Sequence, residues 1–147
     1  MTTIIPERDI QSAFNTELVD AFPAYASAGR IAMQNVDFDP PTSDPWLRGT
    51  LLPAEPDIAT LGMPPFMQYQ GIYQVDVFTK QNIGPYAPST IAAEVVAAFT
   101  SGLPGRMLVF NGLEIRIVKA WLGQATPEDT GWYHIPVNIA YRCHSND

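Results

Sequence analysis

The sequence predicts a single α+β domain, with a mixed or antiparallel sheet of about five to six strands and two main helices packed on it. The chain has 147 residues, the size of one domain. Residues 69–78 alternate between two kinds of side chain, as a half-buried strand does. Residues 91–99 then repeat apolar side chains at helical spacing. We therefore expect the order α-β-β-β-α-β-β-β over residues 1–147.

The first helix is expected from Pro6 to Phe22. Pro6 suits the first helical position, and acidic side chains follow it in the first turn, where the helix dipole favours negative charge. Pro23 ends the helix because it cannot continue the hydrogen-bond pattern. Residues four apart form one apolar face: Ile10, Phe14, Leu18 and Phe22.

Two strands are expected next, at residues 30–36 and 46–52. Residues 37–45 separate them and hold three aspartates and three prolines, a composition typical of a loop. In the second strand, Trp46 faces opposite to Leu47 and Leu51.

A second loop is expected over residues 53–68, which hold four prolines. This loop is long for a compact domain, and long loops are often functional. It is also apolar, which is unfavourable in water. We predict that its apolar side chains contact a neighbouring subunit or a partner protein: Leu61, Met63, Phe66 and Met67.

The central strand has one apolar and one polar face. Tyr73, Val75 and Val77 share the first face. The second face is the candidate surface toward solvent, a partner or a channel, and its polar residues are Gln70, Gln74 and Asp76.

The helix that follows is expected to bury a face formed by Ile91, Val95 and Phe99. Ser89 or Thr90 is the expected N-cap. The expected stop signals are Gly102 and Pro104.

A hairpin is expected around Asn111-Gly112, because this dipeptide between apolar runs suits a turn with two positive φ angles. A bulge is expected near Lys119, where the alternation breaks. Pro136 predicts that the last strand, 132–142, is a sheet edge or carries a bulge. Residues 143–147 are expected to fray.

The sequence contains no motif for catalysis, metal binding or phosphate binding that we recognise. His144 adjoins Cys143, but one Cys-His dipeptide lacks the spacing of a zinc site. Cys143 also lacks an evident base to act as a nucleophile, and His134 is expected to be a solvated surface residue. We therefore expect no enzymatic activity, no metal and no cofactor.

Three aspartates, Asp37, Asp39 and Asp44, leave an alternative open. They suit turns, in which their side chains bond the backbone. They could instead serve a small-molecule or hydrolytic site, although their spacing fits no EF-hand loop.

Composition favours an assembly subunit. The net charge is −7, and the eight basic residues are spread singly, which argues against tight phosphate binding. Only 16% of residues are charged, and such a surface suits an oligomer. A single cysteine suits a reducing compartment, and we find no signal peptide and no membrane-spanning segment. Strand edges and apolar loops pair with neighbours.

In order, several segments resemble the tail terminator-like proteins of long-tailed bacteriophages, the group related to the lambda tail terminator. The resemblance covers about Ile10 to Arg142. The segments are IAMQNVDFDP (31–40), PWLR (45–48), LG (61–62), GIYQVDV (71–77) and GWYHIPV (131–137).

The resemblance implies an α+β virion protein that is assembled in the host bacterial cytoplasm and caps the finished tail tube. It also implies that polymerisation of the tube stops there and that a head-proximal surface is offered for joining to the head. The implied partners are other copies in a hexameric ring, the tail tube protein and the head connector. DNA would cross the ring without specific binding, and no catalytic residue comes with the family.

One alternative is a different assembly factor, such as a head–tail joining protein or a minor tail protein. A small-molecule binding or hydrolytic domain is the alternative from a different class.

Overall fold

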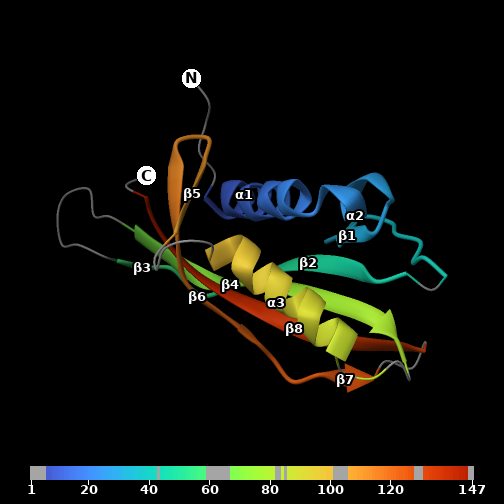
Figure 1. Ribbon diagram of the computed structural model, residues 1–147. Helices are drawn as coiled ribbons and strands as arrows, with labels where there is room; N and C mark the ends of the chain where they lie inside the picture. The colour runs from blue at the N-terminus through green and yellow to red at the C-terminus, as the bar shows by residue number, and fades with distance from the viewer. Residues whose placement is uncertain are drawn as a thin grey trace.

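The computed structural model describes residues 6–42, 44–58, 67–81, 84, 86–100, 106–127 and 131–145. Here the chain forms a twisted sheet with its helices on one face (Figure 1). The α+β class and the mixed sheet are confirmed. The predicted order of elements was incomplete, because the structure adds a short helix and two strands of two residues each.

The elements are, in chain order, α1 (Pro6–Ala21), α2 (Pro23–Ser27), β1 (Ile31–Met33), β2 (Trp46–Pro53), β3 (Asp57–Ile58), β4 (Met67–Lys80), α3 (Tyr86–Thr100), β5 (Met107–Phe110), β6 (Leu113–Leu122), β7 (Thr126–Pro127) and β8 (Trp132–Ser145). Pro23 separates α1 from α2, which it begins, since a proline fits the first turn of a helix. β3 and the first residues of β4 fall within the segment expected to be a loop.

α3 begins at Tyr86, so the expectation that Ser89 or Thr90 caps it is wrong. Pro88 lies in the first turn, where a helix does not need its N–H groups. The Thr90 hydroxyl donates instead to the Tyr86 carbonyl within the helix, at 2.9 Å. The expected stop signals Gly102 and Pro104 lie outside the described residues.

The six longer strands follow the order β1-β2-β4-β8-β6-β5 across the sheet, while β3 pairs with β4 and β7 with β8. β1 is parallel to β2, and the other neighbouring pairs are antiparallel. β4 and β8 are both 14 residues long and pair along their whole length, so they form the centre of the sheet.

Pro136 was expected to mark a sheet edge or a bulge. β8 is an interior strand, so the edge is wrong, and its register with β4 runs without a shift through Pro136, so no bulge lies there. Pro136 pairs with β4 on one side and faces the connection between β6 and β7 on the other. The Gly123 N–H donates to its carbonyl at 2.7 Å. A residue in an antiparallel strand directs N–H and C=O to the same side. The absent proline N–H therefore falls where the neighbouring ladder is interrupted.

Two local predictions in the C-terminal half are confirmed. The hairpin turn has positive φ at both central residues, 54° at Asn111 and 80° at Gly112. The register of β6 against β8 shifts between Ile117 and Lys119, where a bulge was expected. β8 runs on to Ser145, so the predicted fraying from Cys143 onward is wrong as far as Ser145.

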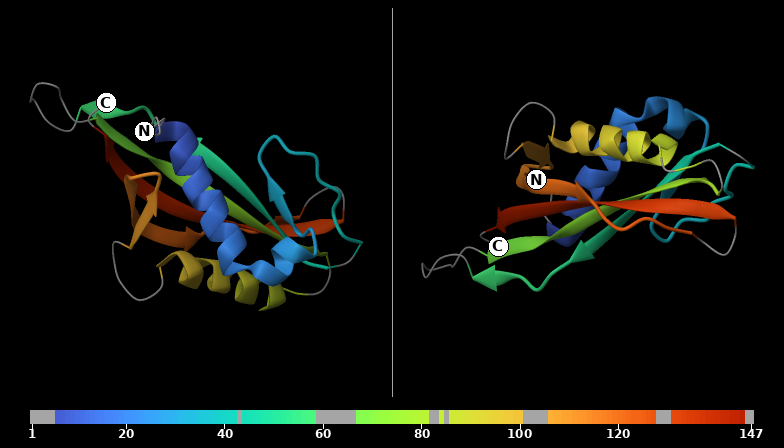
Figure 2. Two further views of the ribbon diagram at one scale, coloured as in Figure 1. Left: turned by 90° about the horizontal axis from the view of Figure 1, so that it is seen from above. Right: turned by 60° about the horizontal axis from the view of Figure 1, so that its bottom comes forward.

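The main core lies between the helices and the sheet (Figure 2). The Phe14 ring of α1 stacks on Tyr73 of β4 with centroids 4.8 Å apart, and Phe99 of α3 lies 6.0 Å from Phe14. Ile91 is only partly buried. The other apolar faces expected from the sequence are buried: Ile10, Phe14, Leu18, Phe22, Tyr73, Val75, Val77, Val95 and Phe99. Of the helices described, none is long and apolar enough to cross a lipid bilayer.

Candidate assembly surface

The sheet face that carries no helix is the candidate functional surface. Alternate residues of a strand point to opposite faces, and the register aligns those of neighbouring strands in rows. We call this surface the helix-free face. Its side chains are Trp46, Arg48, Thr50 and Leu52 of β2, Gln70, Ile72, Gln74, Asp76 and Phe78 of β4, Arg116, Lys119 and Trp121 of β6, and Trp132, His134, Asn138, Ala140 and Arg142 of β8.

Aromatic residues bury one end of the helix-free face. Trp46 and Phe78 are paired in register, and their rings stack in parallel with centroids 3.9 Å apart. Trp132 packs edge-on against Trp46 at 5.9 Å. Phe38, from the connection between β1 and β2, lies 5.0 Å from Trp46. This second, small core covers one end of the helix-free face.

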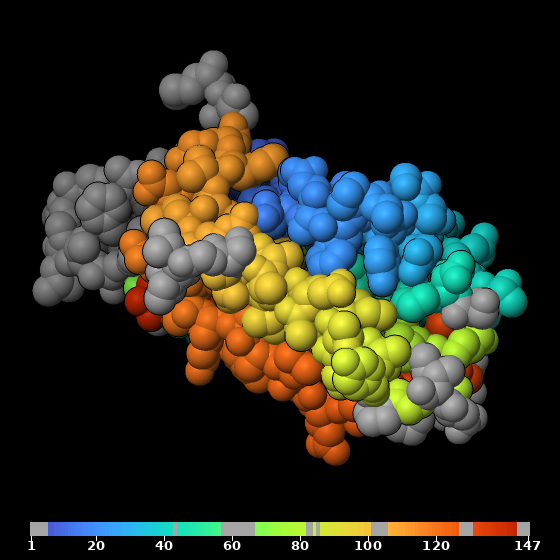
Figure 3. Space-filling model, viewed as in Figure 1, coloured from blue at the N-terminus to red at the C-terminus, as the bar shows by residue number. Residues whose placement is uncertain are grey.

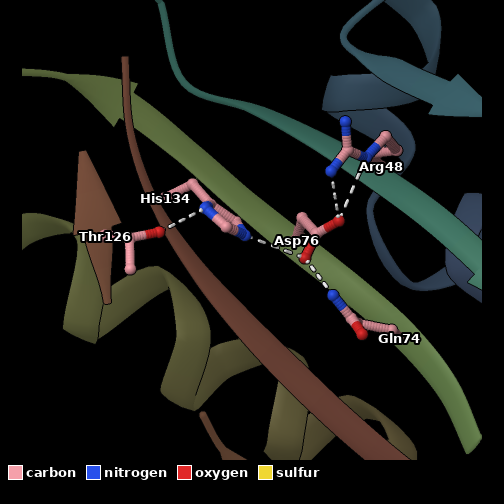
Figure 4. Close-up of polar contacts among 5 residues, drawn as sticks. All are labelled: Arg48, Gln74, Asp76, Thr126 and His134. Carbon is pink, nitrogen blue, oxygen red and sulfur yellow. Dashed lines mark hydrogen bonds and ion pairs between the residues drawn. The ribbon is translucent and has the colours of Figure 1, made fainter. Parts of the chain in front are cut away.

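Asp76 lies beside this aromatic end and is 1% exposed (Figure 4). The guanidinium of Arg48, on the neighbouring strand, donates to Oδ2 through Nε at 3.0 Å and Nη2 at 2.8 Å. Gln74 Nε2 donates to Oδ1 at 2.7 Å, and His134 Nε2 lies 3.3 Å from the same oxygen. Three strands therefore converge on one carboxylate, which fixes their relative register.

The pKa of Asp76 reflects two opposing effects. Burial alone raises this pKa because it disfavours the charged carboxylate. Hydrogen bonds from His134, Gln74 and Arg48, together with the Arg48 charge, outweigh burial and hold the pKa below its usual range. Asp76 is thus an ionised and buried residue that binds side chains of its own chain. It is less accessible than its predicted position on the polar face of the strand suggested.

His134 connects Asp76 to β7. Its Nδ1 lies 3.1 Å from the Thr126 hydroxyl, and its ring stacks on Phe78 with centroids 5.2 Å apart. In the neutral imidazole that donates from Nε2 to Asp76, the Thr126 hydroxyl donates to Nδ1. The expectation that His134 is a solvated surface residue is wrong, because its side chain is only 15% exposed.

A hydroxyl, an imidazole and a carboxylate in series have the connectivity of an acyl-transfer triad. The carboxylate of such a triad stabilises the imidazolium that forms during the reaction. Here Arg48 already neutralises Asp76 through two hydrogen bonds, which weakens that effect. The arrangement therefore suits a structural role, in which hydrogen bonds hold β2, β4, β8 and β7 together, better than it suits proton transfer.

The middle of the helix-free face is more open. Leu52, Ile72 and Ala140 form an apolar row across β2, β4 and β8. Leu52 is 46% exposed, and Trp121, on β6, is 38% exposed. Lys119 places its ammonium 5.0 Å from the centre of the Trp121 ring. Apolar side chains exposed along a sheet face are typical of a protein contact surface.

The predicted contact residues divide into two groups. Leu61, Met63 and Phe66 lie outside the described residues. Met67 is partly buried at the start of β4, where it pairs with β3 and with the end of β8. Gln70 and Gln74 lie partly exposed on the helix-free face, in the strand that also holds Asp76. A contact with a partner stays a prediction for all seven.

Sequence reasoning missed Arg48, His134 and Thr126 as partners of one cluster. Arg48 and His134 have the expected strand parity, but they meet only because their strands are neighbours of β4. Thr126 lies in a two-residue strand that no sequence pattern predicted. Asp37, Asp39 and Asp44 are all exposed, near the aromatic end. In the part of the chain that the structure describes, no three His, Cys, Asp or Glu residues group to hold a metal ion.

Comparison with known proteins connects this fold to a family. One solved structure, which bears no functional name, is 28% identical with a TM-score of 0.70 and covers 95% of this chain and 96% of its own. A chain from the virion of a native gene transfer agent particle has a TM-score of 0.56 at 18% identity, covering 97% of this chain and 100% of its own, which shows a shared fold.

No curated protein matches the chain. The family model described as phage tail terminator protein matches residues 9–141, most of the sequence. This chain therefore belongs to the phage tail terminator protein family and is a structural protein of the phage tail in the virion.

Proposed function

We propose that this protein caps the finished tail tube, stops polymerisation of the tube protein and forms the head-proximal end of the tail that joins the head. The family match over residues 9–141 is the observation that carries this proposal. The shared fold of a chain from a virion particle is consistent with a role in such an assembly.

We propose that the functional form is a hexameric ring around the channel that DNA crosses. A ring of identical chains needs two different surfaces on each copy that fit one another. The helix-free face offers the apolar row of Leu52, Ile72 and Ala140, and both Leu52 and the nearby Trp121 are exposed. The net charge of −7 favours passage of DNA without retention, since tight phosphate binding needs clustered lysines or arginines.

The contacts with neighbouring copies and with the tube protein are proposed to include two groups of residues. Gln70 and Gln74 contribute from the helix-free face, where Asp76 holds the strand in place. Leu61, Met63 and Phe66 contribute from the segment before β4, and Met67 contributes from the start of β4. The remaining exposed surface of the ring is left for the head connector.

Electron microscopy of phage particles made without this protein tests the proposal. Overlong tails of variable length are the expected result, because nothing then ends polymerisation. Supplying the wild-type chain in trans should restore a uniform length. Full heads separated from tails of normal length would contradict capping and would instead assign a head–tail joining role.

A further inference from the structure

Two arginines lie directly opposite each other on the helix-free face. The register pairs Arg116 of β6 with Arg142 of β8, and both side chains are exposed. Like charges at directly opposite positions of an antiparallel pair are destabilising. Among the described residues, neither guanidinium forms an ion pair with a carboxylate. The pair is thus two adjacent positive charges without an ion-pair partner among the described residues, in a chain of net charge −7.

The arginines line a pocket that is large enough for a side-chain carboxylate. Its volume is about 210 Å³, and Met107 and Glu114 complete its lining. Guanidinium groups bind carboxylates through two parallel hydrogen bonds, so two of them can hold one or two acidic side chains. The methionine supplies an apolar rim, as at the edge of a protein contact.

We propose that Arg116 and Arg142 bind the acidic segment of a neighbouring copy of this chain, namely Asp37, Asp39 and Asp44. This contact rests on the ring proposed above and deepens it by naming the two surfaces that meet. The three aspartates are exposed, and none of them is ion-paired within the described residues. Along the sequence, they are also the most closely spaced exposed acidic residues that the structure describes.

The positions of the two surfaces suit a head-to-tail ring. Arg116 and Arg142 align with Gln70, toward the end of the sheet where β4 begins and β8 ends. The connection between β1 and β2, which carries the aspartates, lies at the other end of the molecule (Figure 3). Complementary surfaces at opposite ends allow each copy to bind one neighbour on each side.

Protein carboxylates fit this site better than DNA phosphates. Proteins that grip the DNA backbone use many lysines and arginines along one surface. Here the pocket holds only two arginines and also an acidic residue, Glu114, which is too little positive charge for such a surface but enough to pair with one or two carboxylates.

Charge reversal tests the contact. One variant carries Arg116→Glu and Arg142→Glu, and a second carries Asp37→Lys, Asp39→Lys and Asp44→Lys. Each is mixed with preassembled tail tubes, and binding to tube ends is measured by co-sedimentation and electron microscopy. Each variant alone should lose at least about tenfold in binding, the effect expected when buried charge pairs become like-charged. An equal mixture should recover most of the binding, because alternating copies then present opposite charges at every contact.

Two controls separate a lost contact from a misfolded chain. Glu94→Lys, an exposed change on α3, should bind tube ends like wild type. Arg116→Gln with Arg142→Gln should melt at a temperature no lower than that of wild type, because it removes repulsion, and should still lose tube-end binding.

Each other outcome overturns the contact in a recognisable way. If wild type binds tube ends and both reversal variants do so equally well, the ring stands but these surfaces do not form its contact. If the mixture fails to recover, the arginines have a different partner. If the arginine variants assemble normally but lose binding to a duplex DNA at low salt, that partner is DNA. If wild type itself never binds tube ends, the proposed function fails and this contact falls with it.

Discussion

Gly49 leaves the space that Tyr73 occupies. A Cβ at Gly49 would lie 2.0 Å from the Tyr73 hydroxyl oxygen and 2.9 Å from Cζ of its ring. Tyr73 is fully buried, and its hydroxyl donates to Asn15 Oδ1 at 2.6 Å. Burial raises the pKa of this hydroxyl, so it stays protonated and able to donate. The glycine thus lets β2 lie beside a tyrosine that links β4 to α1.

Gly49→Ala is expected to lower the free energy of unfolding by about 1–3 kcal/mol, because an added methyl group in a full core forces side chains to shift. Urea unfolding followed by circular dichroism measures this. Tyr73→Phe alone should also destabilise, since it leaves Asn15 without its donor. Combined with Gly49→Ala, the loss should be smaller than the sum of the two. Strict additivity would show that the hydroxyl is not what excludes the methyl group.

Asp76→Asn is expected to lower the free energy of unfolding at pH 7 by about 1–3 kcal/mol, since it weakens charged hydrogen bonds and leaves Arg48 unpaired. The lower part of that range applies because Arg48 is 44% exposed and screened by water. The measurement is urea unfolding of both chains at neutral and acidic pH. Asp20→Asn, an exposed change on α1, is the matched control and should shift stability little.

The pH dependence has a defined sign. The folded-state pKa of Asp76 is lowered, so its stabilisation is complete above the unfolded-state pKa of about 3.9. That stabilisation disappears as the pH falls through the folded-state pKa. The difference between wild type and Asp76→Asn should therefore be large at pH 7 and shrink below about pH 4. A difference that stays constant down to pH 3 would contradict an ionised Asp76.

The burial of Asp76 shows where residue-level prediction from sequence ends. The alternation of the sequence predicts that Asp76 lies on the face of β4 opposite Tyr73, and the structure places it there. That face is covered locally because Trp46 and Trp132 arrive from distant parts of the chain. Arg48 and His134 likewise meet Asp76 only once β2, β4 and β8 are neighbours. Alternation within one strand contains no information about such neighbours.

At the scale of elements, β8 extends beyond what its own sequence indicates. Cys143 pairs with Tyr69 of β4 and with Ile115 of β6, and it is 1% exposed. Burial raises the pKa of its thiol to about 11. The polar residues after it gave no strand signal. β6 pairs with this end as far as Cys143, and β4 pairs with it as far as Ser145, so the neighbouring strands supply the hydrogen bonds that hold it in the sheet.

The Cys143 thiol is therefore expected to be unreactive in the folded chain. Only the thiolate reacts quickly with disulfide reagents, and here it is both disfavoured and inaccessible. Labelling with an aromatic disulfide at pH 8 should be slow in buffer and fast in urea. Because Cys143 is the single cysteine, the signal has one source. Rapid labelling without urea would mean that the end of β8 frays, as the sequence had suggested.

Elements defined by local signals were predicted well. The α1 periodicity, the Asn111-Gly112 turn and the bulge near Lys119 each depend on residues close in sequence. The helix α2 and the two-residue strands β3 and β7 have too few residues for a periodic pattern. The interior position of β8 was missed because a proline also fits an interior strand where the ladder beside it is interrupted, as it is between β6 and β7 next to Pro136.

At the scale of the whole molecule, the two faces of the sheet have different roles. α1 and α3 bury one face and provide the main core. The helix-free face is closed at its aromatic end and bears exposed apolar and basic side chains along the rest. A subunit that holds its fold with one face has the other available for neighbours. This division fits a protein whose proposed function lies in the contacts it makes within the tail.

Polymerisation of purified tail tube protein in the presence of this chain tests the capping function most directly. Tube lengths are measured by electron microscopy at increasing ratios of the chain to tube protein. We predict that the mean length falls steeply at a small molar fraction of the chain, with the chain found at one end of each tube. An unchanged length distribution, with no chain at tube ends, would contradict capping.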